Sequence, residues 1–188
     1  RNFLFVAFVL LFSIGSTYPG EWSGYIAGET RYFFHDPIQN VQHDENLSLS
    51  FQPEYYHAWD NESQSLAFVP FFRLDGHDNE RTHFDIRELT WVKVSTAWEL
   101  RVGIRKLFWG VTESQHLVDI INQTDLVENP DGEDKLGQPM LNMAFIHDWG
   151  TLDLFLMPWF RERTFPGIEG RLRPTFLIDT DRASYASG

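Results

Sequence analysis

The chain has 188 residues, no cysteine and a formal net charge of −12 at pH 7. This length allows one sizeable domain, and the absence of thiols excludes disulfides and thiolate chemistry. The negative charge argues against nucleic acid as a partner, because phosphate binding requires clustered Lys and Arg. Aromatic residues make up 16% of the chain, with seven Trp and seventeen Phe. A chain this aromatic and this polar is expected to sort the two kinds of side chain onto different faces.

The N-terminus has the layout of a secretory signal peptide. Arg1 precedes an apolar run, Phe3 to Ile14, and small residues follow at Gly15 and Ser16. The run is shorter than the ~20 residues that a membrane-spanning helix needs. We therefore predict a signal peptide over about residues 1–17 and an exported domain over residues 18–188. A buried helix or strand is the alternative interpretation of the apolar run.

After residue 20, segments of strand length alternate apolar and polar residues, which predicts half-buried β-strands. The alternation changes phase near Arg87, which predicts a bulge. Pro53 and Pro70 each remove a donor from the ladder, so the ladder is expected to be open beside them. Seven strands are predicted, at Trp22–Phe34, Leu47–Trp59, Leu66–Leu74, Phe84–Val94, Trp98–Ile104, Leu141–His147 and Thr151–Phe160.

The predicted connections alternate between long and short, which is typical of an antiparallel up-and-down barrel in an outer membrane. Four tryptophans, Trp22, Trp59, Trp98 and Trp149, are predicted at strand ends beside the short turns or the N-terminus. Such rings prefer the headgroup level of a membrane. Bacterial single-chain barrels have an even number of strands, from eight upward. Seven strands therefore predict the N-terminal part of a larger barrel, and closure by homo-oligomerisation stays open.

The stretch Trp109 to Pro139 interrupts the alternation. Thr112 to Gln115 has the spacing of a capping box, which predicts a short helix ending near Asn122. An acidic run follows. A long loop inside a compact domain is usually functional, so we predict that residues 109–139 form a constriction loop.

The position of this loop, between the predicted fifth and sixth strands, is similar to that of the constriction loop in general bacterial porins. The segment also resembles a group of largely uncharacterised proteobacterial outer-membrane proteins. Gln123-Thr124 departs from the proline that usually follows the asparagine in that group. The resemblance implies a bacterial outer-membrane location and a barrel architecture, without implying a substrate. The residues that carry it are Gly103, Trp109, Gly110, Asp119, Asn122, Asp125, Leu126 and Pro139.

If the apolar sets face lipid, the polar sets line a pore, where rings of charge select among solutes. We expect Arg101 and Arg105 to form a basic ladder opposite the acidic loop residues Asp119, Asp125 and Glu128. The alternative is that these charges pair with one another inside a plugged barrel. The expected function is passage of small hydrophilic solutes, with outer-membrane lipid as the other partner and no cofactor. Further predicted pore-lining residues are Glu29, Arg31, Gln52, Glu54, Arg73 and Glu99.

Other chemistries are weakly indicated. Four His-Asp pairs, beginning at His35, His43, His77 and His147, fall in predicted loops or turns, and the acidic run lacks EF-hand spacing. No metal site is predicted. Ser114, His116 and Asp119 do not form a nucleophile–base–orienter set, so no catalytic residue is predicted. An outer-membrane hydrolase and a secreted soluble β-sandwich binding module remain the alternative functions.

Overall fold

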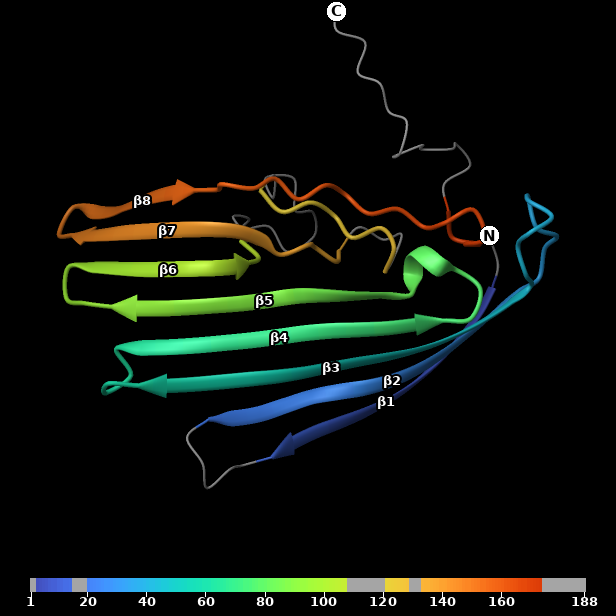
Figure 1. Ribbon diagram of the computed structural model, residues 1–188, viewed down its shortest axis with the longest axis horizontal. Helices are drawn as coiled ribbons and strands as arrows, with labels where there is room; N and C mark the ends of the chain where they lie inside the picture. Colours follow the sequence, from blue (N-terminus) through green and yellow to red (C-terminus); the bar gives the residue numbers. More distant parts are fainter. Residues whose placement is uncertain (1–2, 15–19, 108–120, 129–132, 174–188) are drawn as a thin grey trace, which may run out of the picture.

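The computed structural model describes residues 3–14, 20–107, 121–128 and 133–173, and its strands form one antiparallel sheet (Figure 1). The eight strands follow one another across the sheet in chain order, each hydrogen-bonded to its sequence neighbour. This confirms the all-β, up-and-down antiparallel architecture. In these residues β1 and β8 are the two edges, and the sheet is not closed. The strands are β1 (Phe3–Ile14), β2 (Glu21–Phe33), β3 (Glu45–Trp59), β4 (Gln64–Asp75), β5 (His83–Val94), β6 (Trp98–Arg105), β7 (Gln138–His147) and β8 (Gly150–Leu156).

The predicted count of seven strands is wrong by one. The additional strand is β1, which pairs with β2 along its whole length, from Phe3 opposite Phe33 to Ile14 opposite Trp22. It has no polar alternation, so a search for period-2 patterning passes over it. The last strand ends at Leu156, where the sequence predicted Phe160. The assignment of residues 1–17 as a signal peptide stays a prediction.

The long and short connections lie at opposite ends of the sheet. The turns after β3, β5 and β7 gather at the left in Figure 1, and the longer connections, residues 34–44, 76–82 and 106–137, leave from the other end. A short 3-10 helix, η1 (Asn79–Arg81), lies in the second long connection. No helix among the described residues has the length and apolarity needed to cross a membrane.

The two faces of the sheet differ in polarity. On β3, the side chains of Leu47, Leu49 and Phe51 are 67%, 50% and 38% exposed, whereas Ser48 and Ser50 between them are buried. The register extends this sorting to the neighbours, because Phe51 lies opposite Ile26 and Phe72, and Ser50 lies opposite Ala27 and Arg73. We call the face of Ser50 and Arg73 the inner face, and the face of Phe51 the outer face.

A bulge in β5 places Arg87 on the inner face. The β4–β5 register shifts between Val69, which pairs with Glu88, and Pro70, which pairs with Ile86, so that Arg87 has no partner on β4. The β3–β4 ladder is also interrupted between Phe51 opposite Phe72 and Tyr55 opposite Phe68, the stretch that contains Pro53 and Pro70. Both the predicted bulge near Arg87 and the open ladder beside the prolines are confirmed.

Gly103 on β6 allows the backbones of β5 and β6 to approach each other closely. Its φ is +141°, and a Cβ there would lie 1.8 Å from the backbone oxygen of Leu89. We expect Gly103→Ala to destabilise the fold by about 1–3 kcal/mol through backbone strain, measured by urea unfolding of the purified chain. Gly28 has no atom within 4 Å of the same position. Gly28→Ala is therefore the control, and an equal loss in both variants would contradict the prediction.

Candidate functional site

The described part of the long loop folds over the inner face as a hairpin-like segment. Thr124 and Lys135 form an antiparallel bridge, and the Asp125 N–H donates to the Asp134 oxygen at 2.8 Å. The residues of this loop that the structure describes, 121–128 and 133–137, form bridges and turns and contain no helix. The helix predicted from Thr112, like Asp119, falls on residues 108–120, outside the described residues. The partly helical character of the loop is therefore not supported.

Asn122 fixes the base of this loop. Its side-chain oxygen accepts from the Leu107 N–H at 2.7 Å, and its amide donates to the backbone oxygens of Arg105 and Leu136, both at 2.9 Å. Asn122 is buried, so it satisfies three backbone groups where the chain leaves β6 and returns to β7. Of the residues that carry the family resemblance, Asn122 thus has a structural role.

Glu128, on the loop, is the centre of a buried ion-pair cluster. Arg73 on β4 donates to both of its oxygens, with distances from 2.8 to 3.0 Å. Arg87 lies 3.6 Å away and His83 lies 3.5 Å away, both on β5. The Glu128 side chain is only 4% exposed. A buried carboxylate of this kind requires paired charge, because desolvation is costly.

Glu29 on β2 is the second carboxylate of the cluster. It accepts from Arg73 at 3.0 Å, Arg81 at 3.2 Å and Arg31 at 3.4 Å. Arg81 also pairs with Asp75 at 3.0 Å. The cluster therefore joins β2, β4, β5, η1 and the loop, and it covers the inner face near the end of the long connections.

Arg87 is held in the cluster by an aromatic ring. Its guanidinium carbon lies 3.9 Å from the centroid of Phe71, which is fully buried, and such a contact stabilises a desolvated cation. Its other neighbours are Asp134 at 3.5 Å and Asp125 at 4.0 Å. Lys106 lies nearby, and burial, together with the charge of Arg87, lowers its pKa. Positive groups are thus concentrated around the loop.

The predicted ladder of Arg101 and Arg105 lies elsewhere on the inner face. Arg101 pairs with Glu99 at 2.6 Å and donates to Asn142 at 2.7 Å, and Arg105 has a buried amino nitrogen with no hydrogen-bond partner among the described residues. Of the acidic loop residues predicted to face this ladder, the structure describes Asp125 and Glu128, which face Arg87, and Glu128 also pairs with Arg73. Glu54 accepts from Gln52 at 2.8 Å, nearer the short turns. The structure brings together Glu29, Arg31, Arg73, Asp125 and Glu128. The other predicted residues that the structure describes, Gln52, Glu54, Glu99, Arg101 and Arg105, lie outside the cluster.

Arg81, His83 and Arg87 were missed by sequence reasoning. Arg81 follows a predicted strand in a loop, and no local pattern shows that it turns back over the sheet. Arg87 carried a signal, because the phase shift at this position predicted a bulge, and bulges re-aim side chains. The partner of each arginine depends on contacts between residues far apart in sequence.

The segment after β8 closes over the loop. Arg161 pairs with Asp85 on β5 at 2.5 Å and donates to the Gly137 oxygen at 3.2 Å. Thr164 donates to Asp125 at 2.6 Å. Between this segment, the loop and β5 lies a cavity of about 670 Å³, lined by both charged and apolar side chains. His83, which contacts Glu128, and Asp125, which contacts Arg87, form part of its wall.

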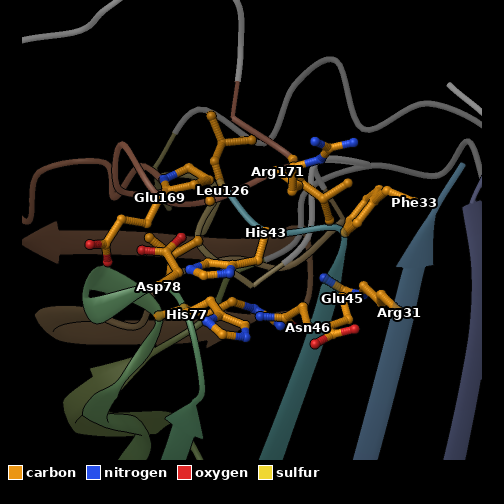
Figure 2. A pocket seen from close by; sticks show the side chains of 15 residues that line it. Arg31, Phe33, His43, Glu45, Asn46, His77, Asp78, Leu126, Glu169 and Arg171 are labelled. Carbon is orange, nitrogen blue, oxygen red and sulfur yellow. The ribbon is translucent and has the colours of Figure 1, made fainter. Parts of the chain in front are cut away.

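The long connections meet at the rim of the sheet (Figure 2). His43 from residues 34–44 stacks on His77 from residues 76–82, with ring centroids 3.9 Å apart. Gln42 donates to the Gly170 oxygen at 3.1 Å. The cavity between these side chains has a volume of about 30 Å³, enough for about one water molecule. Among the described residues, no group of three His, Asp or Glu could hold a metal ion. The rim is therefore a packed junction.

Asp78 fastens the segment after β8 to this rim. Its carboxylate accepts from the N–H groups of Gly167 and Glu80, both at 3.1 Å. Burial raises the pKa of Asp78, and these two donors oppose the rise. Adding a Cβ at Gly170 would bring it within 2.3 Å of the same carboxylate. The close contact therefore depends on glycine.

We expect Asp78→Ala to release residues 166–173 from the rim. Loss of hydrogen bonds to a charged group costs about 1.5–3 kcal/mol, which corresponds to roughly 10–100-fold faster tryptic cleavage between Arg171 and Leu172. Cleavage is followed by mass spectrometry of the full chain. Asp36, an exposed carboxylate of residues 34–44, provides the control variant Asp36→Ala. Equal cleavage rates in the two variants would show that Asp78 does not hold the segment.

Comparison of the chain with known proteins finds no matching family model, no matching curated protein and no matching solved structure. The resemblance of residues 103–139 to outer-membrane proteins therefore stays a prediction.

Proposed function

We propose that this chain is part of a porin-like outer-membrane β-barrel that passes small hydrophilic solutes, with residues 109–139 as the constriction loop. The observation that carries the proposal is the inverted polarity of the sheet. Apolar side chains such as Leu49, Phe51 and Phe72 are exposed on the outer face, while Arg73 and Glu128 are buried on the inner face. A water-soluble sheet buries its apolar face, and a large exposed apolar surface marks a membrane or protein interface.

Three further features support a membrane location. Strands β2 to β5 have 12 to 15 residues, and a tilted strand needs about 9–11 residues to span a bilayer. Trp22, Trp59, Trp98 and Trp149 lie at the end of the short turns, as expected for an interfacial girdle. The segments that leave the sheet cover its polar face, which argues against a soluble sandwich, where a second layer would cover the apolar face.

The N-terminal strand supports export by a cleaved signal. On β1, Leu4 and Phe5 are 55% and 47% exposed, although successive residues of a strand point to opposite faces. A strand lining a polar channel would place polar groups opposite Glu29 and Arg31, whereas Ala7 and Phe5 lie there. Residues 3–14 thus fit the apolar core of a signal peptide better than they fit a channel wall.

Fractionation tests the location, and conductance tests the activity. Full-length protein should fractionate with the outer membrane and migrate differently in electrophoresis with and without heating, because a closed barrel resists detergent until heated. It should then form channels in planar bilayers. A protein that purifies without detergent and shows no heat shift would overturn the membrane location. A heat-modifiable membrane protein that gives no channels would overturn the pore.

A further inference from the structure

We infer that Arg73, Arg87 and His83 form a binding seat for the carboxylate of a small solute, and that Glu128 occupies this seat as an internal stand-in. The inference deepens the proposed function and rests on it, because it is the channel that brings solutes to the inner face. It assigns a chemical class, small carboxylates, to the solute that the constriction recognises.

The contacts of Glu128 are those of a bound ligand. The guanidinium of Arg73 donates to both carboxylate oxygens of Glu128, and a planar guanidinium recognises a carboxylate in this forked way. Arg87 and His83 approach the same carboxylate from β5. All three basic groups belong to the sheet, and the carboxylate belongs to the loop. The binding seat therefore belongs to the sheet, and the carboxylate bound to it, that of Glu128, belongs to the loop.

Arg87 has hydrogen-bonding capacity that Glu128 does not use. It is only 8% exposed, yet its ion-pair contacts with Glu128, Asp134 and Asp125 all lie between 3.5 and 4.0 Å. Its Nε is buried and has no hydrogen-bond partner among the described residues. A guanidinium carries five N–H donors, and an unpaired buried donor is costly. A free carboxylate, not tethered to the loop, could approach Arg87 more closely than Glu128 does.

The seat adjoins a space large enough for a solute. The cavity of about 670 Å³ reaches His83, and sites for small molecules usually measure about 300–1,000 Å³. A solute carboxylate entering there would exchange with Glu128 on the seat, and the Glu128 side chain would turn toward the water of the cavity. A neutral solute offers no charge to replace that of Glu128 between Arg73 and Arg87, so the exchange selects carboxylates.

Calorimetric titration of the full chain in detergent tests this exchange without requiring conductance. The probe is succinate, with butane-1,4-diol as the neutral analogue and sodium chloride at matched ionic strength. We expect saturable binding of succinate alone. Glu128→Gln removes the competing charge but keeps the side-chain shape, so it should tighten succinate binding about tenfold, as when a binding-competent state becomes fully populated.

Variants of Arg87 test whether this residue of the sheet contributes to succinate binding. Arg87→Met should weaken succinate binding at least about tenfold, since hydrogen bonds to charged groups are lost. Arg87→Lys should also weaken it, because an ammonium keeps the charge but lacks the fork. The charge-matched controls are Glu62→Gln in the turn after β3 and Lys93→Met near the far end of β5, and both should bind like the natural protein.

The outcomes separate this inference from the proposed function. Channels in planar bilayers without saturable succinate binding would overturn the seat and leave the channel standing. Succinate binding that depends on Arg87, in a protein that gives no channels, would support the seat and overturn the channel. Binding that is unchanged or weaker in Glu128→Gln would overturn the role of Glu128 as a stand-in. If Glu128→Gln does not fold, the titrations of the natural protein and of Arg87→Lys still show whether the seat binds succinate.

Discussion

Arg73→Met is expected to lower the free energy of unfolding by about 3–5 kcal/mol, the usual cost of removing one partner from a buried ion pair. Arg73 is 5% exposed and contacts the carboxylates of both Glu29 and Glu128. Methionine fills a similar volume but leaves these two carboxylates with less compensating charge. Urea unfolding of the detergent-folded chain, followed by tryptophan fluorescence, measures the loss.

Arg101→Met is the matched control on the same face. Arg101 is 26% exposed at its side chain, and its partner Asp153 is 39% exposed, so its removal should cost no more than about 1 kcal/mol. The double variant Arg73→Met with Glu128→Met should recover part of the loss, since the buried Glu128 carboxylate is then absent, while Arg87 keeps Asp134 and Asp125 as partners. Equal losses for Arg73→Met and Arg101→Met would contradict the burial of the cluster.

The proposed membrane location predicts that Phe51→Arg destabilises the protein in lipid vesicles by about 2–4 kcal/mol, the cost of a cation facing lipid at the bilayer midplane. Phe51 lies near the middle of β3 on the outer face, between Phe12 and Phe72. The position is 38% exposed, so the added charge would meet whatever surrounds the sheet. Urea unfolding from vesicles measures the effect.

Leu47→Arg, nearer the rim on the same strand and face, is the control for depth. Near the membrane interface the cost falls to about 0–1 kcal/mol, so the two variants should differ. If the outer face were in water, both substitutions should change stability by less than about 0.5 kcal/mol. Two such small effects, without a gradient along β3, would contradict the membrane location.

Strand positions could be predicted because the signal is local. Alternation fixes which side chains share a face, and one strand such as Leu47 to Trp59 contains the whole pattern. The phase shift at Arg87 is local as well, and it predicted the bulge. Strand β1 escaped the same reasoning because both of its faces are apolar, and an apolar run of this length is equally typical of a signal peptide.

The partners of the charged residues could not be predicted in the same way. Sequence reasoning placed the acidic loop opposite Arg101 and Arg105, which lie close to it along the chain. The structure pairs Glu128 with Arg73, 55 residues away. This pairing depends on the path of the loop over β4 and β5. Asn122 holds the base of the loop, and Arg161 and Thr164 contact it from the segment after β8.

The sequence by itself determined an antiparallel, up-and-down sheet with one polar and one apolar face and with its long connections at one end. These properties follow from alternation and turn residues, which act over a few positions. Only the tertiary structure decided that Glu29 and Glu128 share Arg73, that Arg87 rests on Phe71, and that the rim is packed by His43 and His77. The physical reason is that a buried charge is stabilised by whichever opposite charge the folded backbone brings within reach, and strand register and loop path set that reach.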